Sequence, residues 1–142
     1  MTLPNEEMLP EVAKMLSEGN CVKLKAKGNS MLPFIVGGRD EVVIEKREEY
    51  NKGDIVLAEV APQRFVLHRI IRMEREGMVL MGDGNLWGTE QCRKESVYGR
   101  VTGIVYQGQI RDCNRKSERW KAEVWQFLLP IRRYLLAIYR RL

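Results

Sequence analysis

The chain has 142 residues, a length that suits one domain with its own hydrophobic core. Apolar residues make up 44% of it and charged residues 30%, which excludes a disordered, collagen-like or low-complexity protein. The three cysteines (Cys21, Cys92 and Cys113) contain no CxxC pair, and a single histidine cannot complete a Cys/His zinc set. We therefore expect free thiols in a reducing compartment, and no metal or cofactor.

The net charge of +5 is concentrated at one end of the chain. Residues 111–142 hold nine basic and three acidic residues, a balance of +6, so the remaining residues sum to −1. The sequence has no run of 18 apolar residues, so we expect no transmembrane helix. Residues 1–20 carry Glu6, Glu7 and Glu11 where a secretory signal would need positive charge. We expect a cytoplasmic protein whose basic end has a function of its own, such as contact with the inner face of the membrane.

The apolar pattern predicts a helix followed by a β domain. Within residues 1–20, Val12, Met15 and Leu16 recur at helical spacing. From residue 21 the period changes to two, and apolar residues alternate with lysines, as in a half-buried strand. Six or seven short strands with hairpin-length connections are predicted up to residue 112, which indicates a mostly antiparallel β domain: 21–27, 41–46, 55–60, 64–71, 78–81 and one or two within 96–112.

Residues 117–142 predict a basic amphipathic helix that Pro130 bends or divides. At 100° per residue, one broad face is apolar, with Phe127, Leu128, Ile131, Tyr134, Leu135, Ile138 and Leu142. The other face gathers Arg132, Arg133, Arg140 and Arg141, although Leu129 and Leu136 lie among them. Three alternatives remain open for this helix. It lies on an anionic membrane surface, packs on its own β domain, or pairs with a second copy in a homodimer.

Three polar residues are candidates for chemistry. Ser30 lies in a turn after a strand, flanked by small or rigid residues that give a hydroxyl room to react. His68, the single histidine, is in phase with apolar neighbours on its strand and has a side chain suited to a general base. Asp83 lies between two glycines in a turn. Each also has an ordinary structural explanation, namely a turn serine, a core histidine and an aspartate that caps its own backbone.

Four segments in order resemble the motifs of signal peptidase I-like serine peptidases, a clan that includes the self-cleaving SOS-response repressors. They are GNSMLP (28–33), KGDIVLAEV (52–60), VLHRII (66–71) and MGDGN (81–85). The bacterial branch uses a lysine base, whereas VLHRII resembles the endoplasmic-reticulum and archaeal branch, which uses histidine. The resemblance spans residues 20 to 106.

This resemblance implies a coiled antiparallel sheet or partial barrel of the signal peptidase-like type, flanked by the two helices. It implies that Ser30 is the nucleophile, His68 its base and Asp83 the acid that supports the histidine. Gly28, Met31 and Pro33 around the serine are then expected to contact substrate, an extended peptide or protein chain. The implied reaction is acyl transfer, with removal of a leader or propeptide.

Two departures from the pattern accompany these assignments. Gly28 stands where some bacterial members carry a hydroxyl residue that donates to the oxyanion, so backbone N–H groups, chiefly that of Ser30, are expected to hold the oxyanion. The histidine branch has a second aspartate after the GD-x-N motif, where this chain has Gly88, Thr89 and Glu90, and Glu90 is a candidate substitute. Arg69 is expected to face solvent, opposite His68. A catalytically silent peptide-binding module of the same fold is the alternative function. Sequence-specific DNA binding is not expected, because about 20 residues before the β domain are too few for a helix-turn-helix domain.

Overall fold

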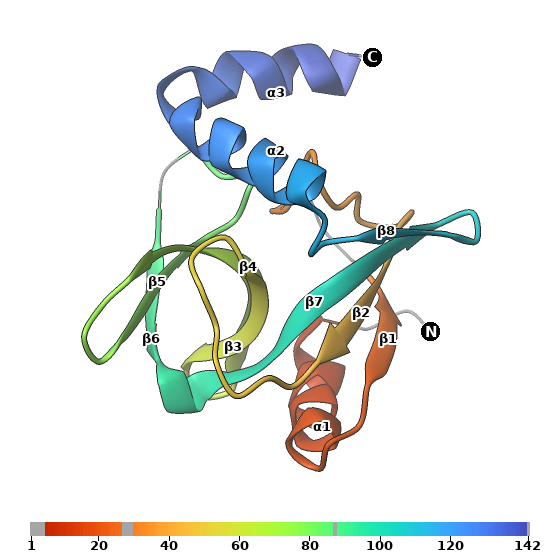
Figure 1. Ribbon diagram of the computed structural model, residues 1–142, viewed down its shortest axis with the longest axis vertical. Coiled ribbons are helices and arrows are strands. Elements are labelled where there is room, and N and C mark those ends of the chain that lie inside the picture. Colours follow the sequence, from red (N-terminus) through yellow and green to blue (C-terminus); the bar gives the residue numbers. More distant parts are fainter. Residues whose placement is uncertain (1–4, 27–29, 87, 142) are drawn as a thin grey trace.

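The computed structural model describes residues 5–26, 30–86 and 88–141 (Figure 1). A helix, α1 (Asn5–Ser17), precedes the sheet, and two helices, α2 (Lys116–Phe127) and α3 (Arg132–Arg141), follow it. The strands are β1 (Val22–Lys25), β2 (Glu41–Glu45), β3 (Ile55–Ala61), β4 (Arg64–Met73), β5 (Gly77–Met81), β6 (Glu90–Arg93), β7 (Val97–Tyr106) and β8 (Gln109–Asp112).

The eight strands form one antiparallel sheet in the order β1-β2-β7-β3-β4-β5-β6, with β8 paired to β7. The order ends at β1 and β6, so the sheet is curled but open. This confirms the expected mainly β fold between two helical ends. The short strand β6, which pairs with β5, was not predicted, because its sequence EQCR has no apolar alternation.

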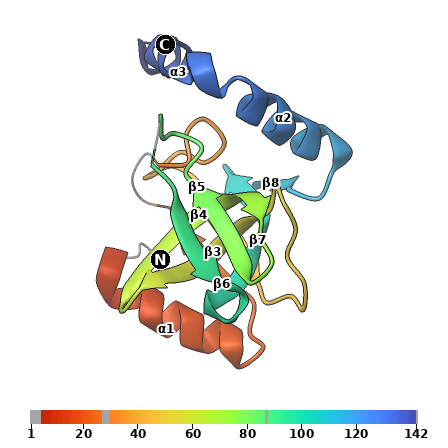
Figure 2. The same ribbon diagram turned by 90° about the vertical axis from the view of Figure 1, so that its left-hand side faces the viewer.

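The core lies on both faces of the central strand β3. Ile55 and Leu57 belong to a cluster that includes Leu16 of α1, whereas Val56 and Ala58 belong to a second cluster with strands β4 and β5. A strand covered on both faces has a continuous apolar run, as in IVLA, rather than an alternating one. Figure 2 shows α1 on one side of the curled sheet and the C-terminal helices on the opposite side.

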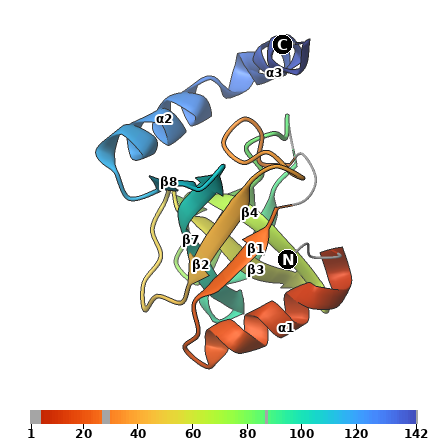
Figure 3. The same cartoon turned by 90° about the vertical axis from the view of Figure 1, so that its right-hand side faces the viewer.

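The C-terminal segment folds onto the β domain. Pro130 divides it as predicted, in the 3₁₀ turn η2 (Leu129–Ile131) between α2 and α3. Leu32, Trp125 and Leu136 form a third apolar cluster that joins these helices to the loop after β1. Figure 3 shows α2 and α3 on the side of the sheet where this loop lies. No helix among residues 5–26, 30–86 and 88–141 is both long and apolar enough to span a bilayer.

The face that α3 turns inward differs from the predicted apolar face. Arg132 has an exposed fraction of 0% and Leu136 is also buried, whereas Phe127, Tyr134 and Ile138 are exposed. The physical reason is that backbone carbonyl groups beneath α3 offer acceptors to a guanidinium group. Arg132 donates to the carbonyl oxygens of Asn85 and Trp125 at 3.0 and 3.3 Å. A hydrophobic pattern alone does not reveal such partners.

Candidate active site

Ser30 is held against the turn that follows β5. Its carbonyl oxygen accepts a hydrogen bond from the backbone N–H of Gly84 at 2.8 Å. A Cβ atom on Gly82 would lie 2.3 Å from the same oxygen, so this close approach requires glycine. Two motifs that are 52 residues apart are therefore in direct contact. Gly28, predicted to line the same site, lies outside the described residues.

His68 is buried on β4, and its side chain lies next to Glu90 of β6. Its Nδ1 atom is 3.3 Å from Oε2 of Glu90, at the start of β6. Among the described residues neither atom has a partner with hydrogen-bond geometry, so the contact is close but is not a well-aligned hydrogen bond, and it becomes an ion pair only when the imidazole is protonated. Glu90, the candidate substitute for the second acid, thus lies beside the imidazole.

Burial of His68 lowers the pKa of its imidazole below the ordinary value of 6.5, because burial disfavours the charged form. The negative charge of Glu90 acts in the opposite direction, and that of Asp83 does so to a lesser extent. Burial has the larger effect. The imidazole is therefore neutral at pH 7, which is the form that can accept a proton.

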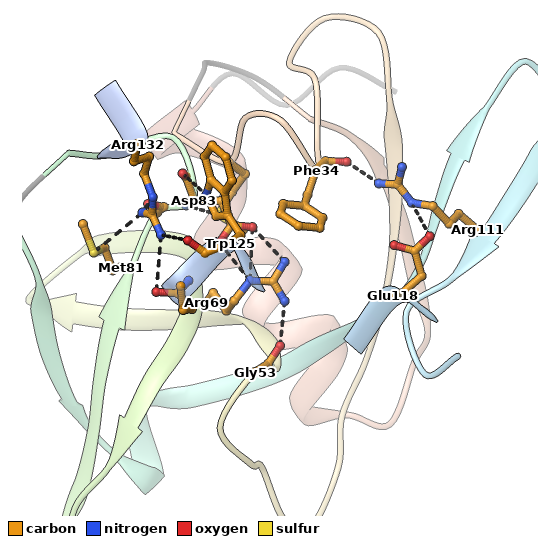
Figure 4. A network of polar contacts seen from close by, with 12 residues as sticks. Phe34, Gly53, Arg69, Met81, Asp83, Arg111, Glu118, Trp125 and Arg132 are labelled. Carbon is orange, nitrogen blue, oxygen red and sulfur yellow. Dashed lines mark hydrogen bonds and ion pairs between the residues drawn. The ribbon is translucent and has the colours of Figure 1, made fainter. Parts of the chain in front are cut away.

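Asp83 binds Arg69 rather than His68. It is completely buried, and its carboxylate accepts hydrogen bonds from Nε and Nη2 of Arg69 at 2.8 and 2.7 Å (Figure 4). This bidentate pair satisfies both carboxylate oxygens. The acid in contact with the imidazole is Glu90, and Asp83 contributes only a weaker, longer-range charge.

The expectation that Arg69 faces solvent is wrong. Its guanidinium group is buried, donates to the carbonyl oxygen of Gly53 at 2.7 Å and lies over the ring of Phe34. The second face of β4 is covered here by the loop that follows Ser30. His68 and Arg69 point to opposite faces of β4, and because both faces are covered, both side chains are buried.

The two other residues predicted to contact substrate have different environments. Met31 is buried in the core, and its sulfur accepts a hydrogen bond from the backbone N–H of Asp83 at 3.4 Å. Its side chain therefore supports the turn after β5. Pro33 is half-buried. With Phe34 it lines an open hollow of about 310 Å³ against α2. Of these two side chains, Pro33 is thus the one next to an open space.

Sequence reasoning missed the residues of α2 and α3 that hold the Asp83 turn. The indole Nε1 of Trp125 donates to the carbonyl oxygen of Asp83 at 2.7 Å (Figure 4). Arg119 of α2 forms an ion pair of 2.9 Å with Asp54, whose carboxylate also caps the turn before β3. One feature of the sequence did point to these contacts. Leu136 lies on the arginine-rich side of the predicted helix, and an apolar residue there indicates that this side packs against the β domain.

The structure brings together all four of the motif segments, but it does not join Ser30 and His68 directly. No hydrogen bond connects the hydroxyl of Ser30 with His68 in the part of the chain that the structure describes. Such contacts are often long in the absence of substrate and shorten when it binds. Within the described ranges, no three His, Cys, Asp or Glu side chains are gathered as a metal site would require.

Comparison with known proteins shows the family of the chain. The LexA repressors of two strains of Cereibacter sphaeroides are each 35% identical to the chain over 95 residues, which cover 64% of this chain and 41% of the relative. The chain thus spans about two fifths of the length of the curated relatives it matches. A family model described as Peptidase S24-like matches residues 2–102, most of the chain including every candidate site residue. The chain therefore belongs to the Peptidase S24-like family.

Proposed function

We propose that this protein is a serine endopeptidase that removes a leader or propeptide from a partner chain by acyl transfer. The observation that carries the proposal is a buried, neutral imidazole beside a carboxylate, on a strand next to the turn that holds Ser30. His68 and Glu90 supply the base and its acid partner, and Ser30 supplies the nucleophile. Asp83 acts through Arg69 to position the turn.

In the proposed mechanism, the hydroxyl oxygen of Ser30 attacks the scissile carbonyl carbon while His68 removes the hydroxyl proton. The charge of Glu90 stabilises the imidazolium ion that forms, as the third member of a catalytic triad does. A backbone N–H, chiefly that of Ser30, stabilises the oxyanion. The imidazolium then protonates the leaving amine, and a water molecule hydrolyses the acyl-enzyme.

The names of the relatives favour a second candidate, a domain of a self-cleaving regulator. In that case the scissile bond belongs to the same polypeptide, and cleavage is independent of protein concentration. The observation in its favour is the 35% identity to repressors. Mass spectrometry of the purified protein over a dilution series separates the two, because self-cleavage shortens the chain at a fractional rate that dilution leaves unchanged, whereas a peptidase that acts only on a partner leaves the purified chain intact.

Ser30→Ala is expected to abolish covalent labelling of the protein by a fluorophosphonate, since the alanine variant has no nucleophilic oxygen at this position. The measurement is the mass shift of the intact protein. Ser17→Ala is a matched control, because Ser17 is exposed at the end of α1 and should leave labelling unchanged. Labelling that persists in Ser30→Ala would refute the nucleophile, whereas a wild-type protein that is not labelled would favour a catalytically silent peptide-binding module.

Glu90→Gln is expected to move the pH dependence of labelling to lower pH. The labelling rate should rise as His68 loses its proton, with a midpoint below pH 6.5 because burial lowers its pKa. Glu90 raises that pKa, so its neutral analogue should lower the midpoint further. The maximal rate should also fall, because the imidazolium loses its partner. Glu49→Gln, an exposed acid elsewhere, is the control. An unchanged midpoint in Glu90→Gln would contradict this role.

A further inference from the structure

We infer that the outer face of α2 and α3 is a docking surface for an anionic lipid membrane. Apolar side chains follow one another along this face at steps of four and three residues. We call this set the outer stripe: Trp120, Val124, Phe127, Ile131, Tyr134 and Ile138. Phe127 has an exposed fraction of 84%, Trp120 of 65% and Ile138 of 60%. Several large apolar side chains left exposed on one pair of helices of a folded domain mark an interaction site.

The outer stripe is fixed in its outward orientation by contacts on the opposite face of the helices. Trp125, Arg132 and Leu136 lie on that inner face and are buried against the β domain. Trp125 and Arg132 also donate hydrogen bonds to the turn after β5. Rotating α2 or α3 to bury the outer stripe would break these bonds. The stripe therefore remains available to something outside the chain.

The chemistry of this face suits the interface of an anionic bilayer. The stripe includes a tryptophan, a phenylalanine and a tyrosine, and aromatic side chains favour the depth of the lipid headgroups. Residues 131–142 contain four arginines and no acidic residue, a charge of +4. Arg132 is buried, and Arg133 is exposed beside Tyr134, with its Nη2 atom 2.9 Å from the tyrosine hydroxyl. Basic side chains next to an apolar stripe attract anionic headgroups.

A second copy of the chain fits this face less well than a membrane. Two-fold pairing through α3 would bring the same basic segment of both copies together, and 131–142 supplies no acid to neutralise it. Glu118 of α2 is already in ion pairs with Arg111 and Lys121. The break at Pro130 also interrupts the straight helix that coiled-coil pairing along the stripe would need.

Vesicle flotation tests the inference with the full-length protein. The protein should float with vesicles of equal parts phosphatidylglycerol and phosphatidylcholine, much less with phosphatidylcholine alone, and less as salt is added. Phe127→Ser, Tyr134→Ser and Ile138→Ser together should weaken partitioning at least about tenfold, because they remove the inserted apolar surface. These positions are exposed, so the fold should persist, which circular dichroism and thermal melting would verify.

The control variant changes three exposed apolar residues on the β domain, Met73→Ser, Tyr106→Ser and Ile110→Ser, and should still float. Absence of flotation, equal flotation with neutral vesicles, or equal loss in both variants would overturn the inference. So would a concentration-dependent dimer in light scattering that the stripe variant abolishes, since the stripe would then be an interface between copies. Fluorophosphonate labelling of Ser30 is a separate readout, so failure here leaves the proposed peptidase activity testable.

Discussion

Replacing His68 by glutamine is expected to slow fluorophosphonate labelling of Ser30 by roughly two to four orders of magnitude at neutral pH, the usual contribution of a general base. Glutamine is polar and of similar size, but it cannot accept the hydroxyl proton. The measurement is the second-order labelling rate across a range of pH. Labelling of the variant should lose the rise with pH that deprotonation of His68 gives the wild type.

The same variant tests whether His68 is buried as described. In the wild type the folded-state pKa lies below 6.5, so under mildly acidic conditions the unfolded chain binds a proton that the folded chain does not. The free energy of unfolding should therefore fall as pH decreases below 6.5. His68→Gln should lack this part of the acid destabilisation. A variant that labels as fast as the wild type would exclude His68 as the base.

Asp83→Ala is expected to lower the free energy of unfolding by about 3–5 kcal/mol, because it leaves the buried guanidinium of Arg69 without its counter-charge. Chemical denaturation measures the loss. Glu74→Ala is the matched control, since it breaks an exposed ion pair with Arg72, which should contribute about 0–1 kcal/mol. A loss as small for Asp83 as for Glu74 would contradict the structural role of the buried pair.

A double variant, Arg69→Met with Asp83→Leu, refines this prediction. Removing both charges leaves no unpaired buried ion, so stability should recover much of the loss in Asp83→Ala. The pH midpoint of labelling in the double variant should shift less than in Glu90→Gln, because Glu90 has the larger effect on the pKa of His68. A larger shift than in Glu90→Gln would assign the supporting acid to Asp83 instead.

Periodicity predicted the strands well where one face or both faces are apolar. Val22 and Leu24 are buried and Lys23 is exposed, as their alternation indicated. The strand β6 was missed because its charged and polar residues sit at the edge of the sheet, where pairing depends on the neighbouring strand β5 rather than on a buried face. The sequence also contained the motifs of the site in order, and two of them meet at Ser30.

The partners of the charged residues could not be predicted in the same way. Arg69 and Asp83 are 14 positions apart and meet because β4 pairs with β5, which places Arg69 opposite Met81, two residues before Asp83. Arg132 is buried because carbonyl groups lie beneath α3. A charged side chain looks solvent-exposed in a sequence, and only the tertiary fold reveals the acceptors that allow its burial.

The bond between Trp125 and the carbonyl oxygen of Asp83 has a consequence for the order in which the protein matures. Trp125 follows Asp83 by 42 residues, so a ribosome that has finished the strands has not yet supplied this partner of the turn. A nascent chain at that stage contains the serine and the histidine but not the helix that anchors the turn beside them. The turn beside Ser30 is therefore anchored only after α2 has been synthesised and has packed against the finished sheet.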